Sequence, residues 1–322
     1  MRMSQIFPAW RMILKGRRPF LSIELTRECP LHCPGCYAYD PNHAGVAGSL
    51  RTLGDLKGND LVKGVLAVTK RFRPLHLSIV GGEPLVRCRE LDTLLPLLAP
   101  TEVQLVTSAV RPIPPVWAKH AHVHIVVSVD GLPQEHNRRR APATYDRILE
   151  NIAHHQVIIH CTITRQLMQR PRYLHDFASF WSKRPEVRKI WFSLFTPQSG
   201  QFPEERLSFL ERERAVMDLA ELPALFPKVY ASRALLDGYA HPPESPAQCT
   251  FARITTCISA DLETEISPCE LGGKPECRQC GCIASAGLAA ISRYRIAGLV
   301  AVDRVYQLSC KIGDARRRRK AG

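Results

Sequence analysis

The 322-residue sequence contains no long hydrophobic run. Its longest apolar stretches, at 283–291 and 296–302, are about half the 18 or so residues that a membrane-spanning helix needs. Near the N-terminus, Pro8 and Arg11 interrupt the segment where a secretory signal would be continuously apolar. We therefore expect neither a transmembrane helix nor a secretory signal, and we predict a cytoplasmic protein.

Aromatic residues and acidic charge are also scarce. The four Trp and eight Tyr form no series that would stack on nucleic-acid bases. Lys and Arg number 44 against 30 Asp and Glu, which gives a net charge of +14, and part of the excess lies in the basic run at 316–320. This charge favours anionic partners, including phosphates, nucleic acid and acidic lipid surfaces, without choosing among them.

Cysteine, in contrast, is abundant, with twelve in the chain. Because no secretory signal is expected, these thiols belong to a reducing compartment, where disulfides rarely persist. Three of them fall within positions 29–36, and six more lie between Cys249 and Cys282. Metal ligation is the leading explanation for both groups.

Strand-like and helix-like segments alternate over the first 200 residues. Runs rich in apolar and β-branched residues recur at 20–26, 76–82, 103–109, 124–131, 157–164 and 189–197. Helical spacing follows at 60–72, 90–98, 114–120, 143–154 and 173–183, and 203–226 also has a helical pattern. The alternation predicts an α/β fold with parallel strands, either an open doubly wound sheet or a closed or partly closed barrel. In both, functional groups gather at the carboxyl ends of the strands.

The first cysteine group follows the first predicted strand directly. Cys29, Cys33 and Cys36 lie at spacings of four and three, so one loop can wrap them around a small cluster. A structural zinc site and a closed iron–sulfur cluster each take four protein ligands. Three cysteines therefore leave one iron for a substrate or cofactor, although zinc with His32 or His43 as a fourth ligand is an alternative.

This loop resembles that of the radical S-adenosylmethionine (SAM) superfamily, whose C-x3-C-x2-C motif follows the first strand of a partial (β/α)6 TIM-type barrel. The resemblance implies a 4Fe-4S cluster on Cys29, Cys33 and Cys36, with SAM chelating the fourth iron. It also implies reductive cleavage of SAM to a 5′-deoxyadenosyl radical, and a low-potential electron donor such as flavodoxin or ferredoxin. Tyr37 matches the aromatic position that lies along the adenine in this superfamily.

Further motifs follow the second and third predicted strands. Gly81, Gly82 and Glu83 match the superfamily's GGE motif, which holds the amino group of the cofactor. Glycine suits this place because the backbone must approach a ligand closely. Ser108 ends the third strand and is a candidate contact to the ribose, although the usual Asn of this turn is missing.

The fourth strand ends in Ser128-Val129-Asp130-Gly131, which matches the S-x-D-G sequence of the branch with C-terminal auxiliary clusters. The segment 136–140 resembles that branch's H-[DN]-x-x-R motif. A guanidinium there would hold the methionine carboxylate of SAM bidentately. Spacing favours Arg140, with Arg138 and Arg139 as alternatives.

The second cysteine group resembles the auxiliary-cluster modules called SPASM and twitch. In these modules a hairpin pair of cysteines and a later C-x2-C hold a further iron–sulfur cluster. The resemblance implies a shortened, twitch-like module whose ligands are Cys257, Cys269, Cys277 and Cys280. Cys249 and Cys310 could add ligands, and Cys282 is a spare thiol. A zinc ribbon is the alternative, because hairpin and C-x2-C spacing also describes that fold.

We expect four parts along the chain. A basic, amphipathic segment at 1–19 precedes a radical SAM partial barrel at 20–230, a Cys-rich auxiliary module at 231–296 and a C-terminal segment with a basic tail at 297–322. The helix expected at 6–14 would close the barrel or touch a membrane surface. The basic tail is either solvated or in contact with anionic lipid.

The resulting hypothesis is a radical SAM enzyme that abstracts hydrogen from, or adds a radical to, an organic substrate. That substrate is a peptide, a small molecule or a lipid-like molecule. Segment 15–20 resembles hopene-adenosylating radical enzymes, and 19 residues are too few for a folded leader-peptide domain, so we favour a small or lipid-like molecule. No nucleic-acid partner is expected. The alternative hypothesis is a basic nucleic-acid-binding protein with a zinc ribbon.

Overall fold

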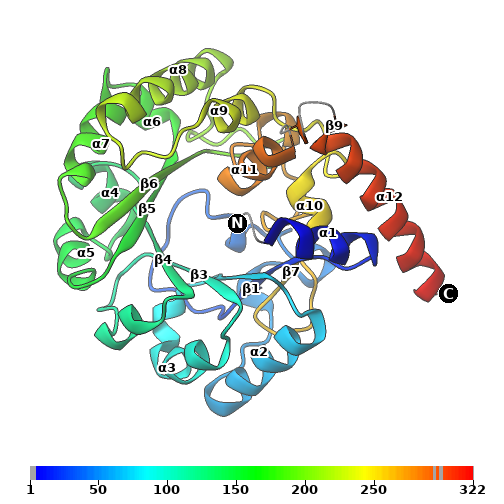
Figure 1. The fold of residues 1–322 in the computed structure, drawn as a ribbon. Coiled ribbons are helices and arrows are strands. Elements are labelled where there is room, and N and C mark those ends of the chain that lie inside the picture. The colour runs from blue at the N-terminus through cyan, green and yellow to red at the C-terminus, as the bar shows by residue number, and fades with distance from the viewer. Residues whose placement is uncertain (1–4, 293–294, 297–299, 322) are drawn as a thin grey trace.

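A computed structural model describes residues 5–292, 295–296 and 300–321. Its centre is a seven-stranded sheet with the order β6-β5-β4-β3-β2-β1-β7, and every neighbouring pair is parallel (Figure 1). The sheet curves but stays open, because β6 and β7 are its two edges. The predicted partial TIM-type barrel is therefore confirmed. The strands are β1 (Phe20–Glu24), β2 (His76–Val80), β3 (Glu102–Thr107), β4 (Val123–Ser128), β5 (Val157–Ile163), β6 (Val187–Leu194) and β7 (Thr255–Ile258).

Helices cover the outer face of the sheet (Figure 1). Side chains alternate along each strand, so Leu21 and Ile23 of β1 join the hydrophobic core with the outer helices, while Ser22 and Glu24 face the barrel interior. The interior is thus left for polar groups. The covering helices are α2 (Gly58–Phe72), α3 (Cys88–Leu97), α4 (Pro133–Arg140), α5 (Tyr145–Asn151), α6 (Arg165–Met168), α7 (Tyr173–Ser182), α8 (Phe209–Leu225) and α9 (Arg233–Ala240).

Two helix predictions differ from the structure in extent. The segment predicted at 114–120 forms a short 3-10 helix, Pro115–Lys119, which begins at consecutive prolines and ends where His120 returns to extended backbone. The helix predicted from residue 203 begins at Phe209. Ser208 caps it in a capping box with Glu211, which fixes the start there.

The cysteine-rich segment folds against the open side of the barrel. It contains α10 (Thr250–Ile254), β7, a 3-10 turn at Cys277–Gln279 and α11 (Ile283–Ser292). β7 pairs with β1, so part of the predicted auxiliary module extends the barrel sheet. The predicted hairpin is present as a turn after β7, where Ile258 bridges Glu265. α11 packs closely on α9 at Gly238, where an added Cβ would lie 3.0 Å from Ala286.

The first and last helices, α1 (Ile6–Leu14) and α12 (Val302–Ala321), lie side by side at the edge of the molecule (Figure 1). Trp10 donates a hydrogen bond to Ser309 (3.0 Å), and Ile13 packs with Tyr306. The amphipathic helix predicted at 6–14 is confirmed, and α12 receives its apolar face. α12 follows a short pair of strands, β8 (Arg295–Ile296) and β9 (Val300–Ala301).

None of the helices within the described ranges is both long enough and apolar enough to span a bilayer. The basic run partly lies outside the described residues, because the side chains of 317–320 are not described.

Candidate active site

A cavity of about 330 Å³ opens at the carboxyl ends of the barrel strands. Cys29, Cys33 and Cys36 lie in the loop after β1 and line this cavity, each partly exposed. Burial raises the pKa of the Cys29 thiol to about 11. Metal binding at this loop therefore releases protons, because thiolates are the ligands. The donor set fits a cluster, since three sulfurs from one loop face a space large enough for one.

Glycine shapes the cluster loop at Gly35, which has a φ of +61°. A Cβ at this position would lie 2.4 Å from Glu205 Oε2 and 2.8 Å from a ring carbon of Phe195. No other residue fits without displacing a side chain that supports the loop.

The predicted GGE motif forms a tight turn beside the same loop. Gly82 has a φ of +55°, and an added Cβ would lie 2.4 Å from the carbonyl oxygens of Thr26 and Glu28. Glu83 is almost fully buried and accepts hydrogen bonds from the Ser108 N–H (2.7 Å), the Ser108 hydroxyl (2.5 Å), the Thr107 hydroxyl and the Leu85 N–H. The structure thus brings Glu83 and Ser108 together, with Ser108 holding the carboxylate.

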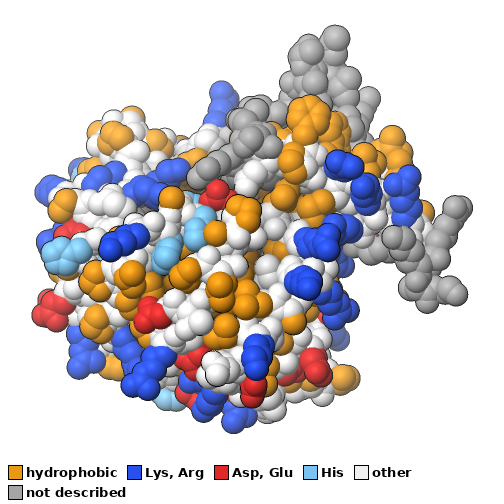
Figure 2. Space-filling model, turned by 60° about the horizontal axis from the view of Figure 1, so that its bottom comes forward, with side chains coloured by type: hydrophobic (Ala, Val, Ile, Leu, Met, Phe, Trp, Pro, Cys, Tyr) orange, Lys and Arg blue, Asp and Glu red, His pale blue; other side chains and the backbone are white. Residues whose placement is uncertain are grey.

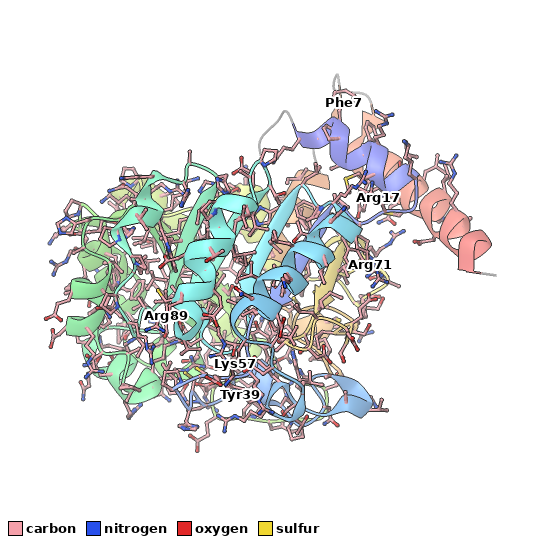
Figure 3. The ribbon with its side chains drawn as sticks, turned by 90° about the horizontal axis from the view of Figure 1, so that it is seen from below. Phe7, Arg17, Tyr39, Lys57, Arg71 and Arg89 are labelled. Carbon is pink, nitrogen blue, oxygen red and sulfur yellow. The ribbon has the colours of Figure 1, made fainter. Side chains whose placement is uncertain are left out.

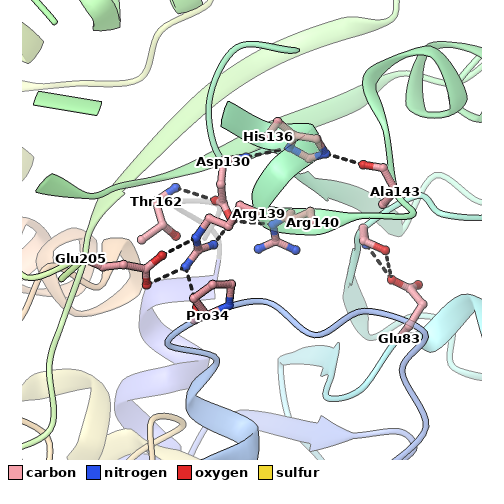
Figure 4. Close-up of polar contacts among 10 residues, drawn as sticks. Pro34, Glu83, Asp130, His136, Arg139, Arg140, Ala143, Thr162 and Glu205 are labelled. Atoms are coloured by element: carbon pink, nitrogen blue, oxygen red, sulfur yellow. Dashed lines mark hydrogen bonds and ion pairs between the residues drawn. The ribbon is translucent and has the colours of Figure 1, made fainter. Parts of the chain in front are cut away.

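A second group of charges lies across the cavity from Glu83 (Figure 4). Asp130 is buried and accepts hydrogen bonds from Arg139, Arg140 and the Thr162 N–H. Burial alone would raise the pKa of Asp130, but the guanidinium groups of Arg140 and Arg139 hold it well below its usual range. Ser128, the first residue of the S-x-D-G sequence, also lines the cavity.

His136 braces this group from behind (Figure 4). Its Nδ1 accepts a hydrogen bond from the Asp130 N–H at 3.1 Å, and its Nε2 donates to the Ala143 carbonyl. Burial, together with the charge of Arg140, lowers the pKa of His136 to about 4. The imidazole is therefore neutral at physiological pH and holds the backbone of the S-x-D-G turn.

The structure adds acidic residues that sequence analysis missed. Glu270 lines the cavity, and the Tyr37 hydroxyl donates to it at 3.4 Å. Burial and the charge of Glu24 raise the pKa of Glu270 to about 7. Glu24 itself is buried and bonds to His43 (2.6 Å) and to the hydroxyl of Ser259 (2.5 Å). The signal available in the sequence was Glu24 itself, a glutamate inside an otherwise apolar predicted strand.

The second cysteine group lines the opposite wall of the same cavity. The thiols in this wall are Cys249, Cys269, Cys277, Cys280 and Cys282. Cys257 is buried on β7, opposite Ser22 of β1, and it does not line the cavity. The remaining cysteines are elsewhere: Cys88 begins α3, Cys161 is buried on β5 and Cys310 lies on α12.

Comparison with known proteins agrees with this site. Residues 23–164 match the sequence profile of the Radical SAM superfamily, a range that includes the three-cysteine loop, Glu83 and Asp130. Residues 23–164, somewhat less than half of the chain, therefore carry a radical SAM domain, a class of enzyme domain that implies a 4Fe-4S cluster and SAM as cofactors. None of the curated protein sequences matches the chain.

Solved structures of radical SAM enzymes share the fold. SuiB of Streptococcus suis bound to S-adenosylmethionine has a TM-score of 0.53 at 15% identity, covering 76% of this chain and 57% of SuiB. SuiB bound to its precursor peptide SuiA has a TM-score of 0.54, with 94% and 67% covered. The enzyme anSMEcpe with bound AdoMet has a TM-score of 0.56 at 13% identity, with 90% and 83% covered. In the first comparison this chain spans somewhat less than three fifths of the length of SuiB.

Proposed function

We propose that this chain cleaves SAM reductively and uses the resulting radical on an organic substrate. One arrangement carries the proposal: Cys29, Cys33 and Cys36 face the same cavity as Glu83 and the Asp130–Arg140 pair. When held by these cysteines, a 4Fe-4S cluster would supply the low-potential electron that reductive cleavage of SAM requires. The protein binds, orients and excludes water.

The cavity offers complementary groups for each part of SAM. Cys29, Cys33 and Cys36 would hold the cluster. The GGE turn, Gly81 to Glu83, would hold the amino group, and Ser108 and Ser128 lie nearby in the wall. Arg140 would meet the carboxylate, with Asp130 fixing the guanidinium. Tyr37 would flank the adenine, since its ring belongs to the same wall.

We further propose that the second cysteine group holds an auxiliary iron–sulfur cluster. Five of its thiols, Cys249, Cys269, Cys277, Cys280 and Cys282, line the same cavity as the three-cysteine loop. A closed iron–sulfur cluster takes four cysteine ligands, which this group can supply.

The substrate is proposed to present a polar group to the barrel interior. His160 and Ser193, hydrogen bonded at 2.8 Å, line the inner cavity with Gln104, Ser128 and Trp191. Burial lowers the pKa of His160 to about 4, so its imidazole is neutral. Such a wall suits a polar small molecule or a peptide side chain better than a hydrocarbon chain.

An acidic membrane surface is a proposed contact for α1 and α12. Phe7 and Leu308 are 77% and 59% exposed, and basic residues such as Arg17 lie nearby. Figure 2 shows Lys and Arg side chains interspersed with hydrophobic ones over the face that it presents. Figure 3 places Phe7 at the opposite end of the molecule from Tyr39 of the cluster loop. A membrane contact at α1 would therefore not deliver lipid to the cavity.

A low-potential donor such as flavodoxin or ferredoxin is proposed to supply the electron. The net charge of +14 favours association with an acidic carrier. A cytoplasmic location is also proposed, because the described cysteines form no disulfide and the cluster needs thiolates. The nucleic-acid-binding alternative finds no support, since the matched proteins are radical SAM enzymes.

Anaerobic reconstitution followed by counting of iron and sulfide tests the proposal. We expect about eight irons per chain, four for each of two 4Fe-4S clusters, and a brown protein. About four irons would refute the auxiliary cluster and retain the radical SAM cluster. A colourless protein that binds only zinc would refute both.

A further inference from the structure

A second cavity, of about 390 Å³, lies at the cluster loop, and we call it the outer groove. Its lining includes Arg27, Cys29, His32, Tyr39 and Arg51, of which Arg27, His32 and Arg51 are exposed at the surface. Of the three cysteines expected to hold the cluster, Cys29 is the one that lines both the outer groove and the cavity in the barrel. Tyr39 lines both as well, so these two side chains lie between the surface and the SAM cavity.

Tyr39 connects Cys29 to the charged rim of the outer groove. Its side chain lies within hydrogen-bonding reach of the Cys29 side chain, and its hydroxyl donates to the Arg27 carbonyl at 3.1 Å. The Arg51 guanidinium stacks on the Tyr39 ring, 4.1 Å from the ring centre, in a cation–π contact. A partner that contacts Arg51 is therefore separated from Cys29 by one aromatic side chain.

The outer groove carries positive charge that is available to a partner. Among the residues that the structure describes, no Asp or Glu forms an ion pair with Arg27 or Arg51. Glu28 also lines the groove, but its carboxylate is already paired with Lys57 (2.6 Å) and Arg87 (2.9 Å). The two arginines therefore favour an acidic partner at this place.

Hydrogen bonds to uncharged backbone and side-chain groups hold both arginines in position. Arg27 Nη1 donates to the Leu53 carbonyl at 3.0 Å, and Arg51 Nη2 donates to His32 Nδ1 at 3.1 Å. Neither acceptor is a carboxylate, so these bonds orient the guanidinium groups without neutralising them. The positive rim is thus arranged before a partner arrives.

Two other exposed arginines provide a comparison. Arg71 is also stacked on an aromatic ring, that of Phe72 at 5.1 Å, but Figure 3 places it away from Tyr39. Arg278 is exposed beside Cys277, in the second cysteine group. Arg51 differs from both because it is linked through Tyr39 to a cysteine of the first group.

We propose that the outer groove is the docking site of the acidic electron-carrier protein that reduces the cluster. The proposal rests on the proposed function, since it places the electron donor of that reaction. Electron transfer slows steeply with distance, and the outer groove brings a carrier to Cys29 itself. In this step the carrier loses one electron, the cluster held by Cys29, Cys33 and Cys36 gains it, and no bond forms or breaks.

Binding of an acidic flavodoxin to the reconstituted protein tests the docking site without turnover. Arg51→Glu should raise the Kd of oxidised flavodoxin at least about tenfold at low ionic strength, and added salt should reduce this difference. Its iron count should match that of the wild type. Arg71→Glu is the matched control and should leave the Kd unchanged. An unchanged Kd in Arg51→Glu, or a raised Kd in Arg278→Glu instead, would overturn the proposal.

Two electron sources separate docking from catalysis. With reduced flavodoxin below saturation, Arg51→Glu should form 5′-deoxyadenosine at least about tenfold more slowly than the wild type. With excess dithionite, which needs no docking surface, the two rates should be equal. An equal loss with both sources would show that the substitution disturbs the cluster loop, and would overturn the docking site. Wild-type cleavage with dithionite but no binding of flavodoxin would overturn docking alone, whereas no wild-type cleavage with dithionite would overturn the proposed function.

Discussion

Arg139 and Glu205 form a two-point ion pair that fastens the cluster loop to the barrel. The guanidinium Nε and Nη2 donate to the two carboxylate oxygens at 2.6 and 3.0 Å, and Nη2 also donates to the Pro34 carbonyl at 3.0 Å (Figure 4). Arg139 in addition binds Asp130 at the end of β4. One side chain therefore joins the S-x-D-G turn, the segment before α8 and the loop that carries the three cysteines.

Glu205→Gln should loosen the cluster loop. The variant loses a nearly buried ion pair while Arg139 keeps Asp130, so we expect the free energy of unfolding to fall by about 1–3 kcal/mol. The radical SAM cluster should also be lost faster to an iron chelator. Urea denaturation and chelation kinetics measure the two effects, with the exposed neighbour variant Glu204→Gln as control. Equal behaviour of both variants would contradict this role of Glu205.

Gly35→Ala and Gly45→Ala separate backbone strain from crowding. The two glycines have φ values of +61° and +62°, but an added Cβ meets Glu205 and Phe195 only at Gly35 and meets nothing within 4 Å at Gly45. Backbone strain in either variant should lower the free energy of unfolding by about 1 kcal/mol. Gly35→Ala should lose at least about 1 kcal/mol more and bind less iron at the first cluster. Thermal unfolding and iron counts check this, and similar losses for both would refute the crowding argument.

Glu83→Gln should weaken SAM binding. The carboxylate accepts four hydrogen bonds, and an amide would place N–H donors against the Ser108 or Leu85 N–H. The displaced turn should raise the Kd for SAM at least tenfold, equivalent to about 1.4 kcal/mol. Equilibrium binding to the reconstituted protein measures this, and the exposed Glu221→Gln is the control. An unchanged Kd in Glu83→Gln would show that the turn does not contact SAM.

Stability should fall as the pH is lowered below about 6.5, partly through His136. Burial and Arg140 lower the folded-state pKa of His136 to about 4, whereas a histidine in the unfolded chain titrates near 6.5. Between these two pKa values the unfolded state binds more protons than the folded state. The free energy of unfolding should therefore fall by about 1 kcal/mol between pH 7.5 and pH 5.5. His136→Asn should be less stable at pH 7.5 but show a smaller decrease. Urea denaturation at both pH values measures this, and an unchanged decrease would contradict it.

The barrel was largely predictable from the sequence because its strands are nearly continuous apolar runs. Such runs are expected of parallel strands that are covered on both faces of the sheet. β4 and β5 follow this pattern closely. The helix α4 was not predicted, since its sequence, Pro133–Arg140, has no apolar period. It is stabilised instead by tertiary contacts, in which Arg139 and Arg140 bind Asp130.

Candidate site residues were predictable where a motif directly follows a strand, as for Cys29 after β1 and Glu83 after β2. Residues that act through distant contacts were not predictable. Glu205 lies 66 positions from Arg139, and Glu24 lies 235 positions from Ser259. The sequence did not predict that β7 joins the sheet, for the same reason. Its four residues give little periodicity, and its partner β1 is at the other end of the chain.

Formation of 5′-deoxyadenosine tests the central claim most directly. The reconstituted protein, given dithionite and SAM under anaerobic conditions, should produce 5′-deoxyadenosine. A variant with Cys29, Cys33 and Cys36 all changed to Ala should produce none. Cleavage of SAM that survives this triple change, or its absence from a wild-type protein that carries the cluster, would contradict the account.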